Sequence, residues 1–221
     1  MKILTPRVLR ALERFNSAHP WDHNAHYHPW LLRQLPRRFD RAMDVGCGTG
    51  DLARLLAGRA NRVCGVDSDP EIVARARELT GDQYAHVTFS VADAPGGLPP
   101  GPYDVITCVA VLHHLPLAES LACFRQRLAP GGTLVVIGLA REETFVERLL
   151  GNLSVPLNAV TGWIKNGGRA APRPVAMTAA TQAAEASLAE IVREAGRILP
   201  GARIRRRLFW RYTLVRRRDA G

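Results

Sequence analysis

A glycine-rich turn between an apolar run and a helical pattern is the feature that most constrains how this chain can fold. The segment Arg41–Gly50 reads RAMDVGCGTG, and a leucine pattern at helical spacing begins at Leu52. This order predicts a strand that passes through a tight turn into a helix. Glycine permits positive φ and lets the backbone approach a ligand closely. We expect the N–H groups at the start of the helix to face that ligand.

The spacing of the glycines separates two kinds of nucleotide-type site. Gly46, Gly48 and Gly50 form a G-x-G-x-G pattern, whereas the dinucleotide fingerprint is G-x-G-x-x-G. Asp44 lies just before the first glycine, where a negative charge does nothing for a pyrophosphate and suits a ligand that carries a sulfonium and an α-amino group. A nicotinamide-dependent oxidoreductase is therefore the disfavoured alternative.

The segment Arg41–Gly50 resembles motif I of the class I S-adenosylmethionine (SAM) dependent methyltransferases, and the similarity is strong over residues 38–140. The resemblance implies an α/β fold with a Rossmann-like, doubly wound, seven-stranded sheet, mostly parallel with a terminal antiparallel strand pair. It also implies SAM as cofactor and S-adenosylhomocysteine as product. We expect one domain over 1–221, made of an N-terminal helical lid (1–36), a SAM-binding core (38–140), a variable substrate loop (151–176) and the strand pair (201–218).

Acidic residues at two further strand ends complete the cofactor site that the resemblance implies. Asp67 ends the next expected strand, where a carboxylate can take both ribose hydroxyls. It could instead cap the following helix, but Asp69 and Pro70 make a better helix start. Asp93 follows the expected strand 87–92 and is implied to meet the adenine amino group. The expected cofactor set is Asp44, Gly46, Cys47, Gly48, Gly50, Asp67, Ser68, Ala92, Asp93, Ala94, Val109 and Tyr27.

Two adjacent histidines follow the apolar strand expected at 103–110. The run Leu112–Leu115 reads LHHL and resembles the active-site edge of many small-molecule methyltransferases. An imidazole there can remove a proton from the acceptor as it attacks the methyl group. We name His113 as the first catalytic candidate and His114 as the second. The alternative is that one histidine bonds the backbone and the other is exposed.

The segment His19–Trp30 holds four of the seven histidines among aromatic residues. A metal site is the sharper interpretation, but Asp22 is its only carboxylate, it contains no cysteine and the spacing matches no ligand pattern, so we assign no metal. We prefer a lid over the cofactor and acceptor, in which Tyr27 or His28 reaches one of them. The alternative is an aromatic cap that packs on the sheet.

Beyond residue 140 the pattern is less regular. We expect a helix over 141–150, an irregular segment over 151–174 that is rich in Gly, Pro and Asn and contributes to the acceptor pocket, and a long helix over 178–199. Two strands, 203–208 and 212–218, should then close the sheet. Alternation places Arg203, Arg205 and Arg207 on one solvated face.

The charge of the chain is concentrated at its C-terminal end. The net charge is +10, and ten arginines from Arg193 onward stand against only Glu194 and Asp219. The expected acceptor is a small molecule; an anionic one, a phosphorylated or carrier-bound one, or contact with an anionic membrane surface all remain open. Nucleic acid is disfavoured, because no RNA-binding module is recognisable and no basic run lies beside the expected pocket.

The cysteines and the apolar segments indicate a cellular compartment. The four cysteines have no C-x-x-C spacing and are read as reduced thiols. We find no signal-peptide pattern and no run long enough to span a membrane. We therefore expect a cytoplasmic protein.

These observations lead to one expected function and its rivals. We expect transfer of the SAM methyl group to an O, N or C nucleophile of a small-molecule acceptor, with a resemblance to the quinone-biosynthesis and natural-product tailoring enzymes. A protein that binds SAM without methyl transfer, either a regulator or a catalyst of another reaction, is one alternative. An RNA methyltransferase is the other.

Overall fold

The centre of the molecule is a seven-stranded sheet with the order β3-β2-β1-β4-β5-β7-β6. The computed structural model describes residues 6–174 and 182–219. Five strands are parallel, β7 runs antiparallel to β5, and β6 runs antiparallel to β7. The strands are β1 (Phe39–Val45), β2 (Ala60–Asp67), β3 (Val87–Val91), β4 (Tyr103–Val109), β5 (Leu128–Leu139), β6 (Arg203–Arg206) and β7 (Arg211–Arg217). The expected fold class is confirmed, including the terminal antiparallel pair.

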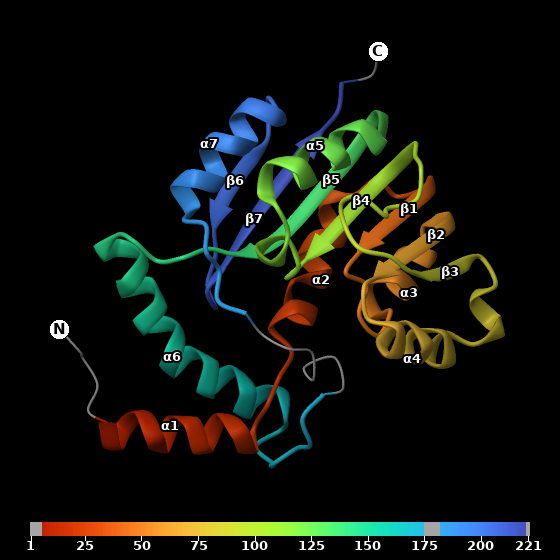
Figure 1. Cartoon of the computed structure of the whole chain (residues 1–221). Coiled ribbons are helices and arrows are strands. Elements are labelled where there is room, and N and C mark those ends of the chain that lie inside the picture. The colour runs from red at the N-terminus through yellow and green to blue at the C-terminus, as the bar shows by residue number, and fades with distance from the viewer. Residues whose placement is uncertain (1–5, 175–181, 220–221) are drawn as a thin grey trace.

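Helices cover both faces of this sheet (Figure 1). One face packs against α5 (Leu117–Arg127) and α7 (Leu188–Ile198), and the fully buried Phe124 lies in that core. The other face packs against α2 (His23–Gln34), α3 (Asp51–Ala57) and α4 (Pro70–Thr80). The sheet order reverses direction between β1 and β4, and open α/β sheets bind ligands beyond the strand ends at such a point.

Side chains placed at helix starts fix where several helices begin. Asp22 and Asp69 accept hydrogen bonds from the first free N–H groups of α2 and α4. Ser187 forms a capping box with Glu190 at the start of α7. This box corrects the long helix expected over 178–199: the helix begins at Leu188, residues 182–187 are not helical, and 178–181 lie outside the described residues.

The irregular segment expected over 151–174 is wrong in its first part, because α6 (Phe145–Lys165) continues through it. A capping box between Thr144 and Glu147 starts this helix. Polar contacts then hold its middle: the Trp21 indole N–H donates to the Asn158 side chain at 2.9 Å, and Ser154 Oγ accepts from the Phe209 N–H at 3.1 Å.

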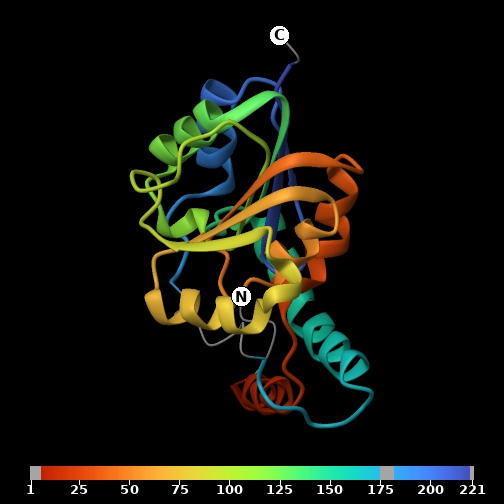
Figure 2. The ribbon, with the colours of Figure 1, turned by 90° about the vertical axis from the view of Figure 1, so that its right-hand side faces the viewer.

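Helices α6 and α1 (Pro6–Ala18) pack on one another and project beyond the end of the sheet (Figure 2). The buried side of α6 carries small residues, while its opposite side is apolar and exposed over an arc of about 100°. The exposed side chains include Phe145, Leu149, Leu153, Val160 and Ile164. No helix in the described ranges combines the length and the apolar character needed to cross a bilayer.

The Pro-Gly-Gly run in Ala129–Gly132, a sequence typical of a turn, lies inside β5. The register with β4 shifts there, from Tyr103 opposite Leu128 to Val105 opposite Thr133. The two glycines thus allow an irregularity within the strand rather than a turn before it.

Replacing Pro156 by alanine tests the corrected helix. Pro156 is exposed and lies inside α6, where proline removes a hydrogen bond and crowds the preceding turn. After allowance for the entropy that proline removes from the unfolded chain, we expect Pro156→Ala to raise the free energy of unfolding by about 1–2 kcal/mol. Urea denaturation measures this change.

The matched control is Pro36→Ala. Pro36 is also exposed but follows the end of α2, so its replacement should bring no gain. Equal effects of the two substitutions would contradict a helix through residue 156.

Candidate functional site

A cavity of about 710 Å³ lies at the carboxyl ends of the parallel strands. Its walls come from the turn after β1, the ends of β2, β3 and β4, and the first half of α2. The expected cofactor residues that line it are Asp44, Gly46, Cys47, Gly48, Asp67, Ser68, Ala92, Asp93, Ala94 and Val109. Residues that are distant in the sequence are therefore gathered in one place, as expected for a single ligand site.

The glycine turn owes its shape to positive φ. Gly46, Gly48 and Gly50 have φ of +70°, +52° and +81°, where other residues are strained. A Cβ on Gly46 would overlap the Val111 side chain, whereas a Cβ on Gly48 would meet no protein atom within 4 Å. Gly48 thus leaves the space that a closely bound ligand needs. Gly50 does not line the cavity and instead begins α3.

Three N–H groups of this turn donate within the protein and are not free for a ligand. Those of Gly46 and Cys47 donate to the Val66 carbonyl at 2.7 and 3.0 Å. That of Gly48 donates to Asp67 Oδ2 at 2.9 Å. At these residues the backbone bonds shape the turn itself; that the N–H groups at the start of α3 face a ligand stays a prediction.

Asp67 holds the turn and still faces the cavity. Besides the bond from Gly48, its other oxygen accepts the Asp69 N–H at 3.1 Å. A carboxylate has about four lone-pair positions, so two backbone donors leave acceptor capacity for ligand hydroxyls. Asp69 caps α4 with its own side chain, which confirms that the helix does not require Asp67 as its cap.

Asp44 is the most deeply buried acid of the site, with 2% of its surface exposed. The Thr107 hydroxyl on β4 donates to Asp44 Oδ1 at 2.7 Å. Burial raises the pKa of Asp44 to about 7; the Thr107 bond opposes this shift and the nearby Asp67 charge adds to it. A bound cation would favour the ionised form.

The two histidines occupy different positions in the short turn η2 (Leu112–His114). His114 lines the cavity and His113 does not. His114 Nδ1 lies 3.1 Å from the Gln182 amide oxygen; because that oxygen only accepts, Nδ1 carries the proton and Nε2 is left as a base. His113 Nδ1 is buried without a hydrogen-bond partner among the described residues, and burial lowers the pKa of His113 to about 4.

The residues of the segment His19–Trp30 make contacts in two different places. Trp21 and His23 contact Asn158 on α6, whereas His28 lines the cavity. Tyr27 does not line it: its ring packs in the core and its hydroxyl donates to the Leu208 carbonyl at 2.7 Å. We therefore drop Tyr27 from the cofactor set. Helix α1 also lies away from the cavity (Figure 1).

Several lining residues were not foreseen from the sequence. Asp22, Asn24, Asp69 and Gln182 line the cavity. Asp22 caps the start of α2, and this start of the helix is the part that lies at the cavity. No signal in the sequence pointed to Gln182. The residues over 6–174 and 182–219 contain no group of three or more His, Cys, Asp or Glu side chains that could hold a metal ion.

The lining of the cavity is strongly acidic. Six aspartates line it, namely Asp22, Asp44, Asp51, Asp67, Asp69 and Asp93. Among the described residues, no lysine or arginine does so. Such a lining attracts a cationic ligand and repels a pyrophosphate.

Comparisons with known proteins indicate the family of this chain. Residues 43–134 match the model of a methyltransferase domain. Over 198 residues the chain is 31% identical to an uncharacterised methyltransferase of Mycobacterium bovis, which covers 87% of this chain and 94% of that protein. A SAM-dependent methyltransferase structure from Mesorhizobium loti superposes with a TM-score of 0.57 at 18% identity, over 92% of this chain and 100% of that one.

The chain belongs to the SAM-dependent methyltransferases, and its cofactor is SAM. It is also 38% identical over 121 residues to a trans-aconitate 2-methyltransferase of Streptomyces avermitilis. That match covers 51% of this chain and 45% of the relative, so the chain spans less than half of that relative's length.

The raised pKa of Asp44 predicts how stability depends on pH. The folded pKa is about 7 and the ordinary value is 3.8, so between these values the folded state binds more protons than the unfolded state. Protonation of Asp44 therefore contributes to the free energy of unfolding. This contribution is fully present below about pH 4 and is lost as the pH rises through 7. The loss is on the order of 4 kcal/mol.

Asp44→Asn isolates this effect, because asparagine keeps an acceptor for Thr107 and does not titrate. We expect the variant to gain stability relative to the parent as the pH rises from 4 to 8, measured by urea unfolding at each pH. A difference that stays constant across this range would contradict the raised pKa.

Proposed function

We propose that the cavity binds SAM and that His114 assists methyl transfer to a small-molecule acceptor. The observation that supports this most is the lining of six aspartates with no lysine or arginine among the described residues. SAM carries a sulfonium and an ammonium group, and the carboxylates favour both. An anionic RNA backbone is disfavoured on the same ground.

The residues present suit the parts of this cofactor. Asp67 accepts from the ribose hydroxyls, and Asp44 favours the methionine ammonium group. Asp93, with Ala92 and Ala94, receives the adenine. Gly48 leaves room for the ligand beside the turn. Ser68, Val109 and the backbone of Gly46 and Cys47 complete the cofactor wall.

SAM supplies an activated methyl group, so the protein contributes positioning and a proton acceptor. His114 faces the cavity with Nδ1 held by Gln182, and its Nε2 is available to take the proton of an acceptor hydroxyl or amine. His113 does not line the cavity. The centres of the His113 and His114 rings lie 3.9 Å apart, so we assign His113 a role in positioning His114.

The acceptor is a small molecule in this proposal. The relative from Streptomyces avermitilis acts on trans-aconitate by its name, which makes carboxylic acids the first class to test. The acidic lining instead favours acceptors without negative charge, so phenols and amines belong in the panel beside the carboxylic acids. We further propose that the protein acts in natural-product biosynthesis and is located in the cytoplasm.

Calorimetry with SAM tests the site. We expect SAM to bind and NAD not to bind, and Asp67→Ala to weaken SAM binding tenfold or more, because the ribose acceptor and the support of the turn are both lost. Asp40→Ala is the matched control: Asp40 is exposed, lies at the far end of β1 and bonds Asn61. Binding of NAD, or equal effects of the two variants, would overturn the site assignment.

Turnover of SAM to S-adenosylhomocysteine with the acceptor panel tests the reaction. With an accepted substrate, His114→Ala should lower turnover about tenfold or more and leave SAM affinity within twofold. His113→Ala should lower it less. If SAM affinity falls together with the rate, His114 is a cofactor contact and not the base. If no carboxylate, phenol or amine gives turnover, the proposed transfer to these acceptor classes is wrong.

A further inference from the structure

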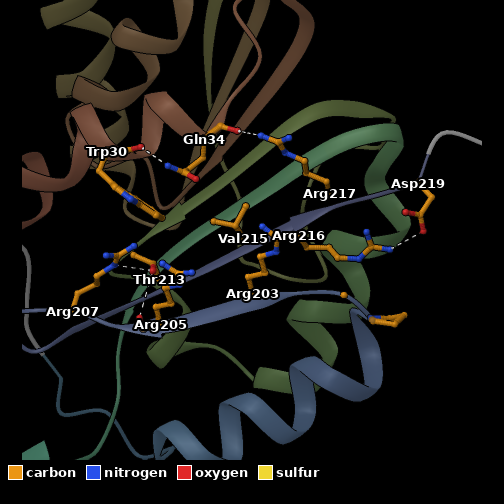
Figure 3. Close-up of a pocket in the computed structure, with 12 residues that line it drawn as sticks. Trp30, Gln34, Arg203, Arg205, Arg207, Thr213, Val215, Arg216, Arg217 and Asp219 are labelled. Carbon is orange, nitrogen blue, oxygen red and sulfur yellow. Dashed lines mark hydrogen bonds and ion pairs between the residues drawn. The ribbon is translucent and has the colours of Figure 1, made fainter.

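A second cavity, of about 810 Å³, lies on the face of the sheet formed by β6 and β7 (Figure 3). Its other wall is the second half of α2, which contributes Trp30 and Gln34. None of the residues expected at the cofactor site lines it. Five arginines line it: Arg203 and Arg205 on β6, Arg207 just beyond β6, and Arg216 and Arg217 on β7. We call Arg203, Arg205, Arg207 and Arg217 the four groove arginines.

Strand alternation explains why the arginines gather on this face. Arg203 and Arg205 lie two residues apart on β6, with Arg207 just beyond, so their side chains share one face. Arg206 points to the other face, where it pairs with Glu142 and Glu147 at 3.4 and 3.6 Å. The same strand thus has a neutralised side and a side of uncompensated charge.

The four groove arginines have no carboxylate partner among the described residues. Among the described residues, the single acid that lines the groove is Asp219, which is paired with Arg216 at 3.5 Å. Guanidinium charges that line one groove repel one another. A groove that gathers them without acids is suited to an anion that supplies the missing charge.

Two of the four guanidinium groups are held in place in advance. Arg207 Nε donates to Thr213 Oγ1 at 3.2 Å, and its guanidinium lies 4.9 Å from the centre of the Trp30 ring. Arg217 donates to the Gln34 carbonyl at 3.2 Å. Arg203 and Arg205 make no side-chain hydrogen bond to the described residues and are exposed. The guanidinium groups of Arg207 and Arg217 are thus fixed at the two ends of the groove, and those of Arg203 and Arg205 between them are free to turn toward a bound ligand.

We propose that this groove binds the oligophosphate group of a small molecule. Arginine recognises phosphate oxygens with two parallel N–H bonds. Four unpaired guanidinium groups match two or three linked phosphates, each of which carries about one negative charge or more at pH 7. The cavity volume lies within the range of small-molecule sites, about 300–1,000 Å³.

The geometry favours a compact ligand over a nucleic-acid strand. The row from Arg203 to Arg207 is about 13 Å long at the usual rise of a strand, which is short for a strand that spans many nucleotides. Single-strand sites also offer aromatic faces on which bases stack. Within the described part of the chain, Trp30 is the only aromatic residue that lines the groove, and the Arg207 guanidinium already lies over its ring.

Binding of inorganic tripolyphosphate tests the proposal. The groove variant is Arg203→Ser with Arg205→Ser, which removes two exposed groups. The control is Arg193→Ser with Arg197→Ser, which removes the same charge from α7 and lies outside the groove. By calorimetry at constant ionic strength, we expect tripolyphosphate to bind, the groove variant to weaken it tenfold or more, and the control to change it less than twofold.

Four outcomes would overturn the proposal. They are no binding of tripolyphosphate, equal effects of the two variants, binding of sulfate as tight as that of tripolyphosphate, and tighter binding of a 20-nucleotide oligothymidine than of tripolyphosphate. The last outcome would assign the groove to nucleic acid. Unfolding temperatures of both variants should match the parent. SAM binding, measured in the same samples, should be unchanged, so this test is independent of the proposed methyl transfer.

Discussion

The bond from the Gly48 N–H to the Asp67 carboxylate is the contact on which the site depends. At 2.9 Å it ties the turn after β1 to the end of the neighbouring β2. The turn has positive φ at three glycines, which adopt it without strain but lose much conformational freedom on folding, so a bond to the neighbouring strand helps to fix this arrangement. One carboxylate therefore does two things: it keeps the glycines in place, and it presents its remaining lone pairs to the ligand cavity.

The parts of this protein that the sequence predicts well are those that depend on local pattern. The five parallel strands, the glycine turn and the acids at strand ends all follow from short-range order. Helix α6 was missed because Gly151, Pro156 and their neighbours disfavour a helix, while the contacts that hold it, from Trp21 and Phe209, come from distant parts of the chain. Intrinsic propensity is a weak guide where tertiary contacts decide.

The sequence also could not predict which of two adjacent residues faces the cavity. Tyr27 and His28 differ by one position, yet on a helix this means about 100° of rotation, and only His28 faces the cavity. His113 and His114 pose the same problem in a tight turn. A sequence can place such pairs at the correct edge of the sheet, but which member faces the ligand depends on how the element is rotated in the packed structure.

Helix α2 separates two cavities of opposite charge, with Asn24 and His28 toward the acidic one and Trp30 and Gln34 toward the basic one. A surface helix of twelve residues normally has a side that is free to vary during evolution. Here the first half of the helix lines the acidic cavity and the second half lines the basic one, while Tyr27 and Leu31 are buried in the core. Few positions remain where substitution is neutral, so sequence drift in this helix should be slow compared with the exposed face of α6.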